Sequence, residues 1–243
     1  MASRVPNPLG EIVNGTSAQR PSRDTRLVGR YVTLVGLSAA HADPLYPHIS
    51  GPENAHLWDY MFEGPYDDIN VYRSSIKAKE ASQDPIFYAI LSNGKPIKAL
   101  AGNDEKSGRV VGIASYLNID PGHRSIEVGH LMYSSQLQRT PGATEAMYLM
   151  LRHAFDDLGY RRYEWKCNSL NAPSSRAALR LGFTYEGLFR KHFIVKGRNR
   201  DTTWYSIIDD EWPSIKKALE AWLDPANFDS EGRQRKKLEE FRQ

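Results

Sequence analysis

Three consecutive features of the sequence could together bind a pyrophosphate. Glu127–Tyr133 has the pattern of a strand, Ser134–Ala143 is a short polar loop, and a helix with one broad apolar face follows from Thr144. The free N–H groups and the positive dipole end at a helix N-terminus attract phosphates. The loop offers small residues and one cation for such a contact: Gly142, Ala143 and Arg139. Loops of this kind are also common as plain structure, so the pattern alone leaves the site open.

A second segment with suitable residues follows the next predicted strand. The strand Tyr163–Cys167 leads into Asn171–Phe183, whose middle part, Ser174–Leu181, has the pattern of a helix. Together the two segments resemble the GNAT acyltransferase superfamily, and specifically its RimJ/RimL-like branch. That family has Gln/Arg-x-x-Gly-x-Gly/Ala before the first helix, then Asn-x-x-Ser and Gly-Phe at the spacing seen here. The hairpin Glu186–Asp201 is similar to that branch as well, and the resemblance covers residues 27–212.

The resemblance implies an α+β fold in which a central, mixed but mostly antiparallel sheet is flanked by helices. Two adjacent parallel strands, Glu127–Tyr133 and Tyr163–Cys167, would splay apart so that acetyl-CoA inserts between them. Backbone amides of residues 138–143 would hold the pyrophosphate, and backbone of the first splayed strand would polarise the acetyl carbonyl. The pantetheine arm and thiol would face the Asn-x-x-Ser motif. The implied cofactor-binding residues are Leu131, Met132, Gln138, Arg139, Thr140, Gly142, Ala143, Thr144, Asn171 and Ser174.

One residue departs from the family's loop pattern. Pro141 stands where the pattern has its first glycine. Proline has no N–H to donate, so one phosphate contact must be lost, shifted or made by a neighbouring residue.

Glu127 is the candidate general base for acetyl transfer to an amine. Alternation along its strand puts Glu127 on the same face as Gly129 and Leu131, with His130 on the opposite face as a packed or hydrogen-bonded residue. Glu127 also lies as far before the phosphate loop as the catalytic glutamate of histone-modifying GNATs. A surface or hydrogen-bonded glutamate at a strand start is the alternative interpretation.

Ser174 is the candidate general acid for the departing thiolate. Many GNATs have a tyrosine four residues before the Gly of Gly-Phe, but Ala178 stands there in this chain. Members of the RimJ/RimL-like branch are thought to use the motif serine instead. Ser174 could equally cap the helix that follows. Cys167, the single cysteine, has no thiolate-stabilising neighbour in the sequence and is expected to be a small buried residue.

The segment between His56 and Tyr66 is the candidate acceptor site, because in the resembling branch a loop in this region borders the amine pocket. Aromatic faces beside the acidic Asp59 and Glu63 would suit an ammonium group or a flat ring. Ordinary core packing explains such aromatics equally well. The candidate substrate-binding residues are Trp58, Tyr60, Phe62 and Tyr66.

The chain divides into three parts. Residues 1–25 lack hydrophobic periodicity and predict a mobile or loosely docked arm, residues 26–212 form the acetyltransferase domain, and residues 213–243 form a C-terminal helix and a solvated or frayed charged tail. The elements predicted, besides those above, are strands at Tyr31–Val35, Ile86–Leu91, Val110–Ile119, Phe183–Val195 and Thr202–Ile208, and helices from Ser38, at Asp67–Ala81, Thr144–Leu158 and Ser214–Leu223.

Composition narrows the class of protein. The 243 residues, 40% hydrophobic and 25% charged, suit one sizeable domain with extensions, and the net charge of +3 is too mild to argue for a nucleic-acid binder. One cysteine rules out an internal disulfide, and no Cys/His spacing suggests a metal site. The sequence has neither a signal-peptide pattern nor an apolar run of membrane-spanning length, which predicts a soluble, cytoplasmic protein.

The leading hypothesis is an acetyl-CoA-dependent N-acetyltransferase. Its acceptor would be a primary amine, either of a small molecule (an amino acid, an aminoacyl conjugate or a toxin) or of a protein N-terminus. The alternative is a GNAT-fold regulatory module that binds an acyl-CoA without significant turnover. A weaker idea is a nucleic-acid arm formed by Arg20, Arg23, Arg26 and Arg30. The sequence leaves the oligomeric state open, a homodimer included.

Overall fold

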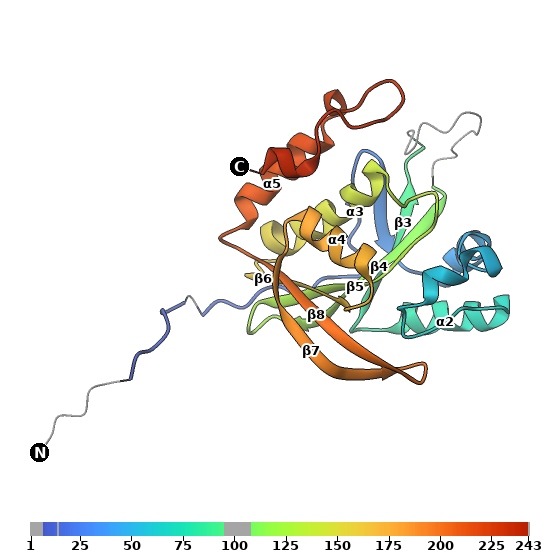
Figure 1. Ribbon diagram of the computed structural model, residues 1–243, viewed down its shortest axis with the longest axis horizontal. Coiled ribbons are helices and arrows are strands. Elements are labelled where there is room, and N and C mark those ends of the chain that lie inside the picture. Colours follow the sequence, from blue (N-terminus) through green and yellow to red (C-terminus); the bar gives the residue numbers. More distant parts are fainter. Residues whose placement is uncertain (1–6, 14, 95–107, 243) are drawn as a thin grey trace, which may run out of the picture.

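Eight strands form one sheet in the order β1-β2-β3-β4-β5-β6-β8-β7 (Figure 1). The computed structural model describes residues 7–13, 15–94 and 108–242. All neighbouring strands are antiparallel except β5 and β6, which are parallel. The strands are β1 (Leu27–Val28), β2 (Val32–Gly36), β3 (Ile86–Ser92), β4 (Val110–Asp120), β5 (Ser125–Tyr133), β6 (Arg162–Asn168), β7 (Thr184–Val195) and β8 (Arg198–Ile208).

Helices cover both faces of the sheet and create two hydrophobic cores (Figure 1). On one face lie α3 (Pro141–Arg152), α4 (Ala172–Leu181) and α5 (Trp212–Leu223). On the other face lie α1 (Ala42–Leu45) and α2 (Ile69–Ala81). We call the first the α3 face and the second the α2 face. Among the described residues no helix has the length and apolar character needed to cross a membrane.

The predicted elements are confirmed, with changes at their ends. The meander of β3, β4 and β5 and the helices α2, α4 and α5 occur where the sequence pattern placed them. Helix α3 begins three residues earlier than predicted, because Thr140 caps it and Pro141 fits its first turn. After Arg152 the same helix continues as a π-helical turn over His153–Asp157. Strand β8 begins at Arg198 rather than Thr202.

The N-terminal segment is attached to the sheet from Ala18 onward. The backbone N–H of Ala18 donates to the carbonyl of Pro121 at 3.0 Å, and Ala18 is buried in the core. The Arg23 guanidinium donates to the Leu37 carbonyl at 3.0 Å, and Arg20 donates to the Gln83 carbonyl at 2.6 Å. Two of the four arginines of the expected basic arm are therefore used in docking. Residues 1–6 and 14 of the predicted N-terminal arm lie outside the described residues.

The C-terminal segment differs from the expected solvated tail, because it folds back over α4 and α5. Leu238 is fully buried, and the Arg242 guanidinium donates to the Leu179 carbonyl at 3.0 Å. The Trp222 indole N–H donates to the Gln234 side-chain oxygen at 2.9 Å. The apolar Leu238, which stands among charged residues in the sequence, therefore anchors this segment.

Glu145 on α3 fixes the turn between β1 and β2. Its buried carboxylate accepts hydrogen bonds from the backbone N–H groups of Arg30, Tyr31 and Val32 at 2.7, 2.6 and 2.9 Å. The fit is tight, since a Cβ added to Gly29 would lie 2.5 Å from the Glu145 carboxyl carbon. The charge is thus compensated by backbone dipoles rather than by a cation.

Glu145→Gln is expected to lower the free energy of unfolding by roughly 2 to 4 kcal/mol, because an amide NH2 would replace an acceptor oxygen against backbone donors. Urea unfolding of the variant and of the exposed control Glu239→Gln would measure the difference. A loss no larger than that of the control would show that the turn does not depend on this carboxylate.

Candidate active site

The parallel strands β5 and β6 pair only at their beginnings. Their registered pairs run from Ser125 with Arg162 to Val128 with Trp165, and in the described sheet no later residues of the two strands are paired. Helices α3 and α4 begin shortly after these strands end. The sheet therefore opens beside the N-termini of two helices, as the resemblance to splayed strands predicted.

A β-bulge at His130 changes which side chains share a face. Ser115 pairs with Gly129 and Ile113 with Met132, so β5 has one extra residue at this point, and His130 has a φ of 50°. Beyond the bulge, Leu131 packs against the core of the α3 face, while His130 lies against Phe87 on the α2 face. The prediction that Leu131 shares the face of Glu127, and that His130 lies opposite, was therefore wrong.

The loop before α3 leaves some of its amides available for an anion. The Gln138 N–H donates to the Ser134 carbonyl, the Ala143 N–H donates to the Thr140 hydroxyl at 3.2 Å, and Pro141 has no N–H. In the described structure no protein acceptor is found for the N–H groups of Arg139, Thr140 and Gly142. Arg139 has a φ of 59°, which turns the chain sharply into the helix. Of the six backbone positions predicted to hold the pyrophosphate, residues 138–143, only three therefore have an N–H group without a protein acceptor in the described structure.

Arg180 on α4 is a cation near this loop that the sequence motifs did not reveal. Its guanidinium donates to the hydroxyl of Thr144, in the first turns of α3, at 3.0 Å, and lies 4.7 Å from the centre of the Trp222 ring. Burial lowers its pKa, although an arginine stays protonated. In the sequence, only its position on the polar side of the predicted helix could have indicated that Arg180 lies near this loop.

The Asn-x-x-Ser motif lies on the α3 face at the start of α4. Asn171 is the N-cap, with its side-chain oxygen accepting from the Ser174 N–H at 3.1 Å. The Ser174 hydroxyl is the acceptor for the Trp165 indole N–H at 3.0 Å. Asn171, and not Ser174, is thus the cap. Ala178, where many relatives have tyrosine, is fully buried.

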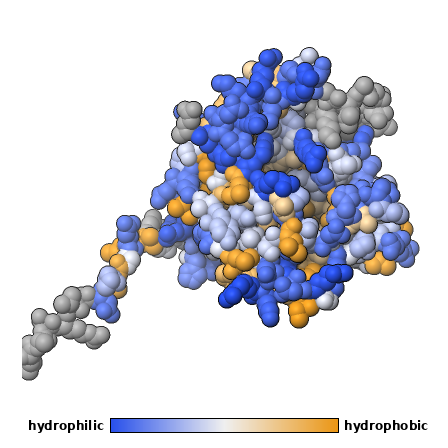
Figure 2. All heavy atoms as spheres, viewed as in Figure 1, coloured by the Kyte–Doolittle hydropathy of each residue, from blue (hydrophilic) through white to orange (hydrophobic). Residues whose placement is uncertain are grey.

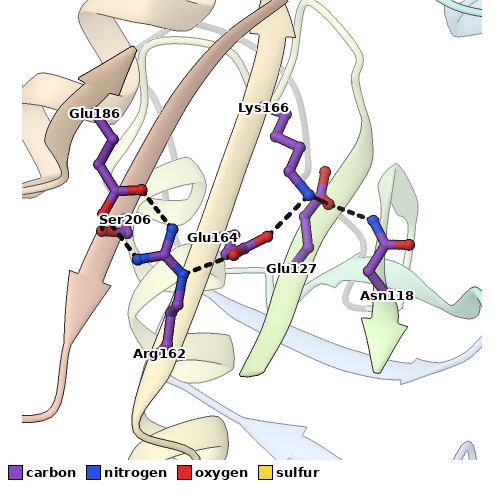
Figure 3. A network of polar contacts seen from close by, with 7 residues as sticks. All are labelled: Asn118, Glu127, Arg162, Glu164, Lys166, Glu186 and Ser206. Atoms are coloured by element: carbon purple, nitrogen blue, oxygen red, sulfur yellow. Dashed lines mark hydrogen bonds and ion pairs between the residues drawn. The ribbon is translucent and has the colours of Figure 1, made fainter. Parts of the chain in front are cut away.

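Glu127 is buried in a band of polar residues that crosses five strands on the α2 face (Figure 3). The Lys166 ammonium and the Asn118 amide both contact Glu127 Oε2 at 2.6 Å, and Figure 3 shows the other carboxylate oxygen pointing away from these partners. Lys166 also binds Glu164 at 2.8 Å. Arg162 extends the band from Glu164 to Glu186, which accepts from Ser206.

The two central glutamates have different electrostatic environments. Burial raises the pKa of Glu127 above its usual value, although Lys166 and Asn118 act in the opposite direction. Burial also acts to raise the pKa of Glu164, but hydrogen bonds and charges from Lys166 and Arg162 outweigh it, so that pKa is lowered. Glu127 is thus the carboxylate that more readily accepts a proton.

The predicted acceptor aromatics divide between the core and the surface. Trp58 is buried, donates to the Ile49 carbonyl and packs edge-on against Tyr66. Tyr66 donates to Glu63, which also binds Lys79 at 2.7 Å. A narrow cavity on the α2 face is lined by Trp58, Met61, Glu63, Tyr72, Ile76, Lys79, Phe87, Ile113, His130 and Met132.

The loop with these aromatics is hydrogen-bonded to the segment between β6 and α4 and to the β7–β8 hairpin. The Tyr60 hydroxyl donates to the Leu170 carbonyl at 3.0 Å, and Lys196 donates to the Trp58 carbonyl at 2.8 Å. Phe62 is about half exposed and packs edge-on against Phe193. Figure 2 shows apolar side chains among charged ones over this part of the surface. Tyr60 and Phe62 thus border the α2-face side of the sheet opening, whereas Trp58 and Tyr66 belong mainly to the hydrophobic core of the α2 face.

The fold and site have the arrangement of an acyltransferase of the GNAT class. The family model described as an acetyltransferase (GNAT) domain matches residues 32–184, so the chain belongs to the GNAT acetyltransferase family. A crystal structure of a GCN5-related N-acetyltransferase from Brucella melitensis is 42% identical and superposes with a TM-score of 0.86, covering 94% of this chain and 98% of that one.

More distant relatives share the domain. The ribosomal-protein-serine acetyltransferase of Escherichia coli is 27% identical over 43% of this chain and 58% of its own length. Two further curated relatives, both from Bacillus subtilis, are matched over 59% and 53% of their length, so the chain spans little more than half of each. A microcin C7 self-immunity acetyltransferase, solved with acetyl-CoA and AMP, is 22% identical, with a TM-score of 0.59 over 74% of this chain and 93% of that one, and shows the same fold.

Lys166→Met is expected to destabilise the protein by roughly 2 to 4 kcal/mol at about pH 8 and by clearly less at about pH 5. Without Lys166 the folded-state pKa values of Glu127 and Glu164 should lie above their unfolded values. A raised pKa contributes stability at low pH that is lost as the pH rises through it. Urea unfolding at both pH values, with the exposed Lys217→Met as control, tests this. An equal loss at both would contradict the assigned pairing.

Proposed function

We propose that this protein is an acetyl-CoA-dependent N-acetyltransferase that acts on a primary amine. The observation that carries the proposal is the opening between β5 and β6. One side of it holds the helix N-termini and Ser174, and the other side holds Glu127 with a partly unsatisfied carboxylate. The described residues fit the cofactor, because three backbone N–H groups without protein acceptors stand at the start of α3.

Bound acetyl-CoA would supply an activated acetyl group, and the chain's own residues would manage the protons. The free Glu127 oxygen would take a proton from the acceptor amine on the α2 face, directly or through one water. Backbone at the bulge, near Leu131 and Met132, would offer N–H groups to negative charge on the carbonyl oxygen. The Ser174 hydroxyl would stand near the sulfur on the α3 face and return a proton to it.

The cofactor loop would combine backbone and side chains. The N–H groups of Arg139, Thr140 and Gly142 would contact phosphate oxygens, and the positive charge of Arg180 would lie beside them. Gln138, Ala143 and Thr144 would shape the loop instead, since the Gln138 side chain already donates to the Tyr133 carbonyl at 2.8 Å and Thr144 accepts from Arg180.

Glu127→Gln is expected to lower kcat about 10²- to 10⁴-fold, because the base is lost while its size is kept. Ser174→Ala is expected to lower kcat as well, and the adjacent Ser175→Ala serves as its control. Thiol release with acetyl-CoA would be measured against primary amines, amino acids and peptide N-termini, beside calorimetric CoA binding. Binding without transfer to any acceptor would favour the regulatory module, and failure to bind CoA would overturn the proposal.

Pro141→Ala is expected to tighten CoA binding, by up to about tenfold, because it restores an N–H at the first helical position, where no intrahelical acceptor competes. Calorimetry would compare it with Pro173→Ala, an equivalent change in the first turn of α4. An unchanged affinity would mean that the phosphates do not approach this position.

A further inference from the structure

Arg200 on β8 is a buried cation without an acidic partner. Its exposed fraction is 7%, and among the described residues no carboxylate lies within salt-bridge distance of it. Its contacts are the Tyr60 carbonyl at 3.3 Å, the Thr202 hydroxyl at 3.4 Å and the face of the Phe62 ring at 4.5 Å. A buried arginine ordinarily has a carboxylate or phosphate partner, because desolvating an unpaired charge is costly.

His192 on β7 is a second unsatisfied group nearby. Its Nδ1 atom is buried and has no hydrogen-bond partner in the described structure. Its ring lies 6.3 Å from that of Trp204, which the Lys166 ammonium faces at 3.9 Å, and the neighbouring Phe193 is paired with Arg200. Burial lowers the pKa of His192, and the positive charges of Arg200 and Lys166 lower it further. Lys166 is neutralised by Glu127 and Glu164, whereas among the described residues no carboxylate forms an ion pair with Arg200 or His192. The local field therefore favours an anion.

Arg200 is on the acceptor side of the proposed active site. Along β8, Trp204, Thr202 and Arg200 alternate onto one face, and the ring of Trp204 lies 3.9 Å from the Lys166 ammonium that holds Glu127. Tyr60 and Phe62, which contact Arg200, come from the predicted acceptor loop. An open hollow lined by Leu188–His192 lies on the neighbouring strand β7.

We propose that Arg200, with His192 beside it, binds an oxyanion group, such as a carboxylate, of the acceptor whose amine is acetylated near Glu127. This inference rests on the proposed function and narrows its substrate class to amines that also bear an acid. The guanidinium would bind the oxyanion with the N–H groups that face the site, and Nδ1 of His192 would donate to it when protonated there. Arg200 thus determines specificity and takes no part in proton transfer.

Acceptors differing in one charge test the proposal. ω-Amino acids of increasing chain length and their primary amides are compared as acceptors, beside peptides whose second residue is Asp or Asn. Wild-type protein should prefer each acid over its amide at least tenfold in kcat/KM. Arg200→Gln should remove this preference by raising KM for the acids much more than KM for the amides, and Arg200→Lys should restore part of it. The exposed Arg198→Gln on the same strand is the control.

The same set of acceptors shows which kind of molecule carries the anion, and it tests the inference separately from acetyl transfer itself. Preference among the amino acids indicates a small acid, whereas preference only among the peptides indicates an acidic N-terminus. Equal rates on acids and amides in wild type, or an equal loss on both in Arg200→Gln, would overturn the inference while leaving acetyl transfer intact.

A binding measurement separates this inference from the transfer reaction. N-Acetylglycine and N-acetylglycinamide are titrated into the CoA complex by calorimetry. Tighter binding of the acid that disappears in Arg200→Gln supports the anion subsite even if no acceptor is turned over, and equal binding of both probes, with no acid preference in turnover, refutes it.

Discussion

The early end of the pairing between β5 and β6 determines the rest of the site. Parallel strands that stay paired would close the sheet, but here the last pair joins Val128 to Trp165, and the bulge at His130 then bends β5 away. The helices that follow both strands consequently begin at the edge of the opening. A group inserted there can be reached from both faces of the sheet.

This geometry creates an electrostatic problem that the polar band solves. Glu127 and Glu164 are directly paired in register on adjacent parallel strands, so two carboxylates lie side by side in a buried layer. Lys166 contacts both, and Arg162 neutralises Glu164 from its other side. Because Glu164 has two cationic partners and Glu127 shares only one, burial prevails at Glu127 and its pKa rises. Unequal sharing of cations thus distinguishes two otherwise similar glutamates.

Element order and most boundaries could be predicted because they follow from local periodicity, as with β4, which was predicted at Val110–Ile119 and is found at Val110–Asp120. The bulge could not be predicted, because nothing in the composition marks a histidine that adopts a positive φ. One inserted residue then moves every later side chain of β5 to the opposite face of the sheet. The partners of Glu127 come from β4 and β6 and depend on strand register. Arg200 lies in a basic hairpin, where the sequence gives no sign that it is buried.

The two faces of the opening differ in how their charges are satisfied. On the α3 face, backbone N–H groups at the start of α3 and the cation Arg180 lie beside the opening, which suits a phosphate-bearing cofactor. On the α2 face Glu127 is paired with Lys166, whereas in the described structure no carboxylate lies within salt-bridge distance of the buried Arg200. A neutral amine would leave that guanidinium uncompensated. An acceptor with both an amine and an acid would satisfy Glu127 and Arg200 together, and the spacing between the two groups would then select its length.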